Sequence, residues 1–269
     1  MPAVREAVVD GLFYPAAPAA LRAQIVDCLA GVGAADDTGH APKLLIAPHA
    51  GYEYCGAVAA QAYALLGRRS ARRIRRVVLL GPAHRVALDG LAAPDAEAFE
   101  TPLGRVAIDT AALAALDDLP QVTRSDRVHE HEHSLEVQLP FLQTVLGSGF
   151  TLVPLIVGDA GAEAVAQVLE RLWGGDETLI VISSDLSHYL SYEQAQAVDR
   201  ATAQRILALD ATLTPHEACG AAAINGALLA VRRHGLAPRV LDLRNSGDTA
   251  GDRDRVVGYA AVSFEEPQR

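Results

Sequence analysis

The sequence is poor in lysine and in cysteine. Lys43 is its single lysine, although lysine and arginine together number 23 of the 269 residues. The three cysteines, Cys28, Cys55 and Cys219, are too few and too widely spaced to form a disulfide framework. Residues 1–10 contain no apolar stretch of the kind that forms a secretory signal. We therefore expect a cytoplasmic protein.

Long hydrophobic runs are also missing. The longest uncharged and mostly apolar stretch, residues 219–231, is too short to span a bilayer. The formal net charge of −10 disfavours binding to nucleic acid or to a membrane surface. Motifs that mark nucleotide binding, serine hydrolysis or zincin chemistry, such as a P-loop or H-E-x-x-H, do not occur. The sequence thus predicts neither a nucleic acid nor a membrane as partner.

Hydrophobic segments of strand length alternate with segments of helical periodicity, a pattern typical of an α/β domain. We expect residues 1–269 to form a single three-layer domain around a mixed, mostly parallel central sheet. Strands are predicted at residues 43–48, 76–81, 151–157, 178–183, 239–244 and 256–264, and residues 86–109 are predicted to be extended. Helices are predicted within 11–30 and at 56–67, 110–118, 134–146, 162–172, 193–209 and 215–234, with Pro140 kinking or restarting the fourth.

Three histidines come just after predicted strands. His49 and His84 follow the first and second strands, and His188 follows the fourth, with Asp185 between that strand and the histidine. Because ligands of open α/β sheets bind beyond the carboxyl ends of the strands, we expect these side chains to share one pocket. Imidazoles and a carboxylate are typical ligands of iron, copper or zinc.

Asp185 and His188 are three residues apart, just after a predicted strand. If Asp185 caps a helical turn, both side chains project from the same end of it. Asp185 could then bind a metal directly or orient His188 through a hydrogen bond. The alternative is that Asp185 is a plain helix cap.

Residues Thr214-Pro-His-Glu217 form a helix-start pattern, with a capping threonine, an early proline and a glutamate that completes a capping box. This pattern places Cys219 about one turn inside a helix, where the helix dipole would lower its pKa and favour the thiolate. The alternative is that Cys219 is a small hydrophobic residue of the core.

Histidine and glutamate alternate in His129-Glu-His-Glu-His133. On a strand the three histidines would share one face, as in a metal-binding tract. No strand is predicted there, however, and a solvated loop is the alternative. The following residues, from Glu132 to Glu136, are expected to open a helix that lines the pocket.

Seven motifs in this order resemble the Memo family, which in prokaryotes is also called AmmeMemoRadiSam system protein B. The resemblance extends from about Gly11 to Tyr259. The motifs are Ala47-Pro-His-Ala-Gly-Tyr52, Leu80-Gly-Pro-Ala-His84, Phe99-Glu-Thr-Pro-Leu-Gly104, Glu132-His-Ser-Leu-Glu136, Pro154-Leu-Ile-Val-Gly158, Ser183-Ser-Asp-Leu-Ser-His-Tyr189 and Ala218-Cys-Gly220.

The resemblance implies a fold like that of class III extradiol dioxygenases, which hold Fe(II) and open catechol rings with O₂. It also implies a pocket that binds iron or copper, with zinc as the less favoured ion. Matched motif by motif, the metal ligands are His49, His84 and Cys219, and the remaining polar groups of the pocket are Asp185 and His188. A cysteine thus replaces the carboxylate ligand of the dioxygenases, which argues against ring cleavage. The family name implies AMMECR-type and radical SAM proteins as partners.

Three hypotheses follow. The first is a metal-dependent redox enzyme in which His188 acts as acid and base and Asp185 orients it. The second is a non-catalytic binding or scaffold protein that keeps the pocket for a small molecule or a peptide. The third and weakest is a zinc hydrolase that uses the same ligands.

Overall fold

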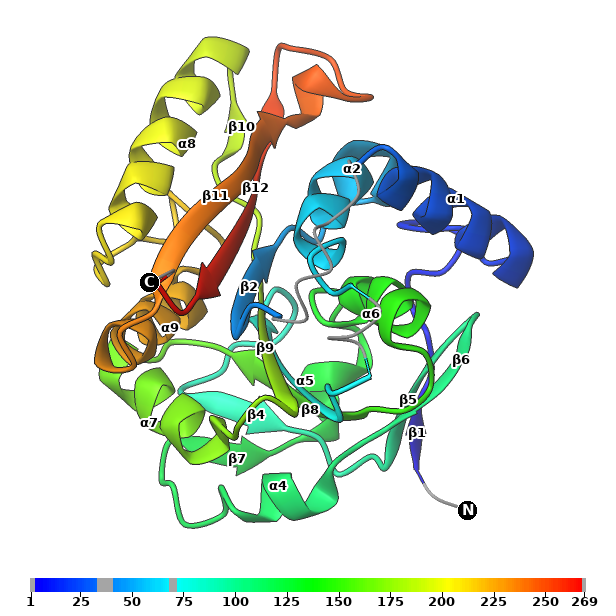
Figure 1. Ribbon diagram of the computed structural model, residues 1–269, viewed down its shortest axis with the longest axis vertical. Coiled ribbons are helices and arrows are strands. Elements are labelled where there is room, and N and C mark those ends of the chain that lie inside the picture. Colours follow the sequence, from blue (N-terminus) through cyan, green and yellow to red (C-terminus); the bar gives the residue numbers. More distant parts are fainter. Residues whose placement is uncertain (1–2, 33–40, 68–71, 268–269) are drawn as a thin grey trace.

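Four parallel strands form the centre of the computed structural model, which describes residues 3–32, 41–67 and 72–267 (Figure 1). They are β2 (Leu44–Ala47), β9 (Thr178–Ser183), β3 (Arg76–Pro82) and β8 (Thr151–Val157), side by side in that order. Nearly all their residues are buried, because helices cover both faces of the sheet. Continuous burial explains their apolar sequences, and each predicted strand is confirmed to within one residue at either end.

The margins of this sheet are antiparallel. On one side β2 pairs with β12 (Val256–Glu265), which in turn pairs with β11 (Ala237–Asn245) and β10 (His188–Leu190). On the other side β8 pairs with β4 (Leu91–Ala93), and β7 (Val122–Arg124) runs parallel to β4. The predicted mixed sheet is thus confirmed, with its parallel strands at the centre.

A second, three-stranded sheet lies beside the first. It consists of β1 (Val4–Arg5), β5 (Ala98–Thr101) and β6 (Gly104–Ala107). The predicted extended region at residues 86–109 contains β4, β5 and β6, so it is divided between the two sheets. This pairing brings the N-terminus next to the middle of the chain.

Helices α1 (Pro18–Ala30), α2 (Tyr52–Tyr63) and α6 (Leu139–Leu146) pack together on one face of the central sheet (Figure 1). Leu21 and Ile25, one turn apart on α1, are fully buried against the core. Pro140 lies in the first turn of α6, where its missing N–H costs no hydrogen bond, so it restarts the helix as one of the two predicted options.

On the other side α9 (Ala221–Arg233) packs against β3 and β9 and also against α7 (Ala162–Leu172), while α8 (Tyr192–Leu207) lies along β11 and β12. The described residues therefore form one α/β domain in which the sheet lies between helical layers. The short helices are α4 (Thr110–Ala114), α5 (Asp126–Glu130), η1 (Glu136–Gln138) and η2 (Ser246–Asp248).

Two local predictions are wrong. The helix expected from residue 215 begins only at Ala221, because the amide of Cys219 donates to the carbonyl of Asp185 across the chain instead of continuing a helix. Only half of the predicted capping box forms. Glu217 accepts from the amide of Thr214, but the Thr214 hydroxyl donates to the Glu217 carboxylate instead of accepting from its amide, and these bonds close an isolated turn. Asp185 caps no helical turn, since residues 184–187 are a loop that leads into β10.

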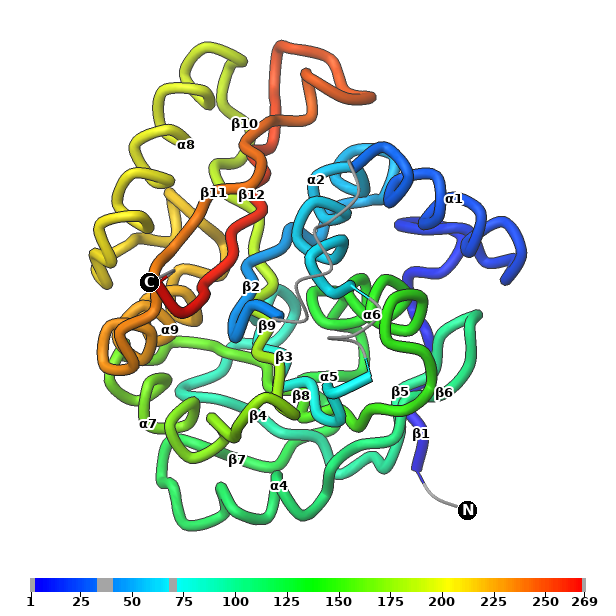
Figure 2. Tube along the Cα trace, in the orientation of Figure 1, coloured from blue at the N-terminus to red at the C-terminus, as the bar shows by residue number. Residues whose placement is uncertain are grey.

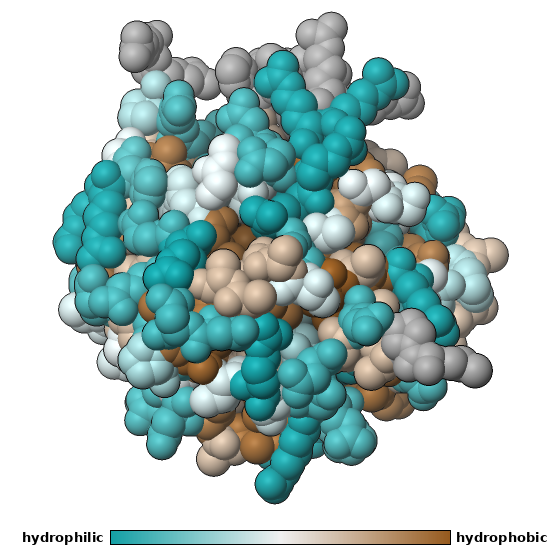
Figure 3. All heavy atoms as spheres, turned by 90° about the horizontal axis from the view of Figure 1, so that it is seen from below, coloured by the Kyte–Doolittle hydropathy of each residue, from teal (hydrophilic) through white to brown (hydrophobic). Residues whose placement is uncertain are grey.

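Charged and polar side chains dominate the face seen in Figure 3, with small apolar areas scattered among them. None of the helices in the described ranges is both long enough and apolar enough to cross a membrane. Figure 2 shows that β2, β3 and β9, which belong to separate parts of the chain, run next to one another.

The contact between α7 and α9 gives the first prediction. A Cβ at Gly226 of α9 would lie 2.3 Å from the Cβ of Val165 on α7. Gly226→Ala should therefore lower the free energy of unfolding by about 1–3 kcal/mol through overpacking, despite alanine's better helix propensity. Urea denaturation measures this change.

Gly161→Ala, at the start of α7, is the matched control, because a Cβ there meets nothing within 4 Å. Because Gly161 is the N-cap of α7 and alanine caps less well than glycine, the control should lose up to about 1 kcal/mol, less than Gly226→Ala. Equal midpoints for the Gly226 variant and the wild type would contradict the close packing of the two helices.

Candidate metal centre

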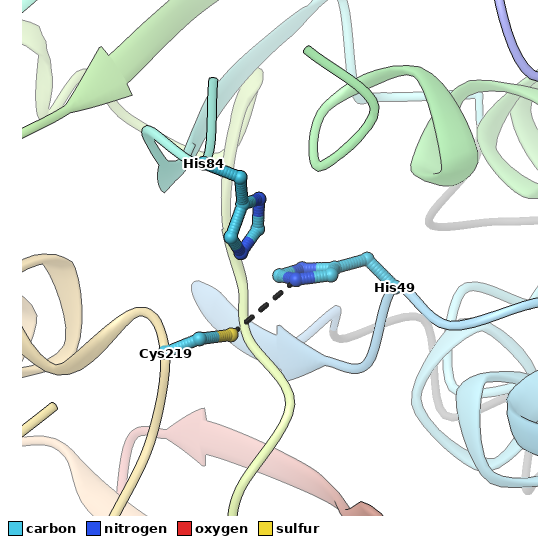
Figure 4. Close-up of side chains that lie close together, drawn as sticks. All are labelled: His49, His84 and Cys219. Carbon is cyan, nitrogen blue, oxygen red and sulfur yellow. Dashed lines mark hydrogen bonds between the residues drawn. The ribbon is translucent and has the colours of Figure 1, made fainter. Parts of the chain in front are cut away.

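The parallel strands β2, β3 and β9 end at the same edge of the sheet, and their loops carry the candidate site. His49 follows β2 and His84 follows β3, while Cys219 comes from the loop before α9. Figure 4 shows the three side chains pointing toward one another. One ligand atom of each lies within 4.8 Å of the other two. The convergence predicted for these residues is therefore present.

The tautomer of His49 follows from its hydrogen bonds. The hydroxyl of Ser183 donates its only hydrogen to the carbonyl of Ser134 at 2.6 Å, and its oxygen accepts from Nε2 of Gln138 at 2.7 Å. Nδ1 of His49, 2.9 Å from the same oxygen, must therefore be the donor. The lone pair of His49 is then on Nε2, which lies 3.3 Å from the sulfur of Cys219.

His49 is also held neutral. Burial, together with the neighbouring rings of His84 and His133, lowers the pKa of His49 well below its usual value. A neutral imidazole with a lone pair on Nε2 is the form of histidine that binds metals.

His84 has a matching arrangement. Its Nδ1 donates to Oε1 of Glu132 at 2.9 Å, and its backbone amide donates to Oε2 of the same carboxylate. Burial would raise the pKa of Glu132, but contacts with His133 and His84 outweigh burial and hold it well below its usual value. Because an ionised carboxylate only accepts hydrogen bonds, the lone pair of His84 is on Nε2, as in His49. In Figure 4 the outer nitrogen of this ring faces Cys219 and His49.

The pKa of Cys219 is shifted in the opposite direction from the sequence prediction. Burial, and to a smaller extent the negative charge of Asp185, raises the pKa of the Cys219 thiol to about 12. The expected lowering by a helix dipole fails because Cys219 precedes α9 instead of lying inside it. Its sulfur accepts a hydrogen bond from the backbone amide of Asp185 at 3.3 Å. The thiol is therefore neutral at pH 7 unless a cation replaces its proton.

Asp185 is buried and holds the backbone of the site. Its Oδ1 accepts from the amide of His49 at 2.8 Å, so it fixes the loop that carries His49. Burial raises the pKa of Asp185, and this hydrogen bond opposes the rise. Its role in orienting His188 stays a prediction, as does the acid–base role of His188 itself.

A cavity of about 790 Å³ opens above these groups. Tyr189 at its rim is 64% exposed and has a left-handed backbone with φ 59°, an uncommon and strained conformation for a bulky residue. The guanidinium of Arg255 lies 5.0 Å from the centre of the Tyr189 ring. The lining includes the polar side chains His49, His84, His133, Asp185 and His188, and the aromatic side chains Phe13, Tyr54, Tyr189 and Tyr259.

The histidine tract contributes one residue to this cavity. His129 is buried, and its Nε2 bonds to the carbonyl of Ala92, while His131 is exposed to solvent. His133 stacks on His84 with ring centroids 4.9 Å apart. The sequence signal for His133 was its place at the start of the expected pocket helix, but alternation alone did not separate it from His129 and His131.

The segment that carries Glu132 and His133 is fixed by Glu136. The Glu136 carboxylate is fully buried and accepts from the Arg5 guanidinium, from the amides of Val8 and Val9 and from the Tyr14 hydroxyl. These bonds tie the N-terminal segment to the wall of the pocket.

The donor set fits a metal ion. Two imidazole Nε2 atoms with free lone pairs and one sulfur converge from three loops, and each imidazole is held by a hydrogen bond on its other nitrogen. This arrangement of ligands and outer partners is typical of protein sites for iron, copper or zinc.

The family model for Memo-like proteins matches residues 5–263, a range that includes every residue of the candidate centre. This chain belongs to the Memo-like protein family. A MEMO1 family protein of Methanopyrus kandleri is 37% identical, with 97% of this chain and 98% of the relative covered. MEMO1 family proteins of Aquifex aeolicus and Sulfolobus acidocaldarius are 34% and 32% identical, each over 97% of this chain and 99% of their own. The family resemblance predicted from the sequence is thus confirmed over nearly the whole chain.

The Glu136 network gives a stability prediction. Glu136→Gln removes the charge that compensates Arg5 and should lower the free energy of unfolding by about 3 kcal/mol or more. Glu100→Gln breaks the exposed pair with Arg105 and should cost less than about 1 kcal/mol. Denaturant titration compares the two, and similar losses would contradict the anchoring role of Glu136.

Asp199 gives a prediction for pH dependence. It is buried on α8 and accepts from the amide of Ser187, in the loop before His188. Burial raises the pKa of Asp199 from 3.8 to about 6, against the effect of this hydrogen bond. The folded state therefore holds a proton that the unfolded state has released between about pH 4 and pH 6, so stability falls as pH rises through this window.

Asp199→Asn should remove this contribution. Between pH 4 and pH 7 the free energy of unfolding of the wild type should fall relative to that of the variant by about 2 kcal/mol. Denaturant titrations of both proteins at several pH values measure the difference, and parallel pH profiles would contradict it.

Proposed function

We propose that this Memo-like protein is a metal-dependent redox enzyme that binds iron or copper through His49, His84 and Cys219. The observation that carries the proposal is the convergence of the three ligand atoms within 4.8 Å. Imidazole and thiolate ligands suit iron, copper and zinc, and zinc is the less favoured ion because the family resemblance points to redox chemistry.

The bound ion would supply one-electron chemistry with O₂ or a related oxidant. The protein's own residues would hold the ion, orient its ligands and bind the substrate. Ser183 and Glu132 hold the imidazoles of His49 and His84 with their lone pairs on Nε2. His188 lies on the cavity wall, where it would accept and return a proton of the substrate.

The substrate would occupy the cavity above the ligands. Its aromatic wall, formed by Phe13, Tyr54 and Tyr189, suits a small organic molecule or a peptide side chain. We place this activity in the cytoplasm, where thiols stay reduced. We further propose AMMECR-type and radical SAM proteins as partners, which follows from the family name alone.

Metal content tests the proposal. Anaerobically purified wild type should contain near-stoichiometric iron or copper, whereas His84→Ala and Cys219→Ser should lose it, because each removes a direct ligand. His131→Ala, in the exposed part of the histidine tract, is the control and should keep its metal. Oxygen uptake with catechols and other phenols then tests for turnover.

Little metal in the wild type even after reconstitution would overturn the proposal and favour a binding module. Zinc without any oxygen uptake would favour a hydrolase instead. Metal that survives both ligand substitutions would place the ion elsewhere in the protein.

A further inference from the structure

A second group of potential ligands shares His84 with the first. His84, Glu132 and His133 each place a ligand atom within 4.8 Å of the other two. Nδ1 of His84 lies 2.9 Å from Oε1 of Glu132, and Nδ1 of His133 lies 3.2 Å from the same oxygen. These atoms are on the opposite side of the His84 ring from the nitrogen that faces Cys219.

The spacing of these atoms is that of ligands around one ion. When metal–ligand bonds of about 2.0–2.2 Å meet near right angles, neighbouring ligand atoms lie about 3 Å apart. The rings of His84 and His133 are stacked with an interplanar angle of 25°, and Phe13 packs against His133 with ring centroids 4.7 Å apart. Both Nδ1 atoms are therefore held toward the same carboxylate.

One of these ligand atoms, Nδ1 of His133, is buried without a well-formed hydrogen bond. Its 3.2 Å contact is with Oε1 of Glu132, an oxygen that already accepts from Nδ1 of His84 and from the amide of Ser134. Buried polar atoms are rarely left in this state, and an unpaired one requires an explanation. An ion bound between the three side chains would provide it.

We propose that His84, Glu132 and His133 form a second metal site, which takes a hard divalent cation such as Mn²⁺. A carboxylate oxygen in place of a thiolate shifts the preference from soft ions toward harder ones. The wide cavity beside these residues leaves room for water or substrate as further ligands.

The two sites compete for His84. A cation on Nδ1 takes the place of the proton that now bonds to Glu132, and the remaining ring proton is then on Nε2. Nε2 is the atom that faces His49 and Cys219, so the first set loses a ligand. One neutral imidazole serves one ion at a time, and the protein would thus select between a soft and a hard metal.

Mn²⁺ binding to metal-free protein tests this site, with the EPR signal of free Mn²⁺ as the readout. The wild type should bind one equivalent. His133→Ala and Glu132→Gln should weaken Mn²⁺ binding by at least about tenfold, since each alters a direct ligand. Cys219→Ser, which disables only the first set, and His131→Ala should bind Mn²⁺ like the wild type.

The test separates this site from the one in the proposed function, although both use His84. Co²⁺ bound by the first set gives a thiolate charge-transfer band, which Cys219→Ser should abolish and His133→Ala should keep. Absence of this band in the wild type would count against the first set alone. Mn²⁺ that fails to bind the wild type, or that is lost in Cys219→Ser and retained in His133→Ala, would overturn the second site.

Discussion

The candidate centre depends on the buried hydrogen bonds made by residues 132–138. Gln138 donates to the carbonyl of Pro48 and to the hydroxyl of Ser183, and Ser134 donates to the carbonyl of Pro82. These three partners are at the ends of β2, β9 and β3. Leaving any one of these buried groups unpaired costs about 1–3 kcal/mol, so the segment fixes the relative positions of the strand ends that carry the histidines.

The same bonds determine the chemistry of the histidines. The hydroxyl of Tyr63 donates to Oε1 of Gln138, which fixes the orientation of its amide and makes the other end a donor to Ser183. Ser183 has one hydrogen, and Ser134 takes it, so His49 can only donate. Tyr63 on α2 thus sets the tautomer of His49 after β2. It does so through Gln138 and Ser183, each of which has only one way left to bond to the next group.

The predictable parts of this fold are those that local sequence determines. Strands buried on both faces are apolar throughout, which revealed β2, β3, β8 and β9, and the rule for strand ends then placed His49 and His84. The partners of these histidines could not be read in the same way, because Glu132 is 48 residues from His84 and no spacing rule connects them. Near Cys219 half of the capping box forms, since Glu217 accepts from the amide of Thr214, but a tertiary hydrogen bond from Cys219 to Asp185 prevents the helix that it predicts.

The electrostatics of Cys219 and His49 favour a metal ligand over a nucleophile. The sulfur and Nε2 of His49 are 3.3 Å apart, a separation that would also suit a thiolate–imidazolium pair. Burial acts against both members of such a pair, since it raises the pKa of Cys219 to about 12 and lowers that of His49. The thiol and the imidazole are therefore both neutral when no cation is bound between them. A divalent cation changes this balance, because it stabilises the thiolate and uses the lone pair of a neutral imidazole, which is the form that burial already favours.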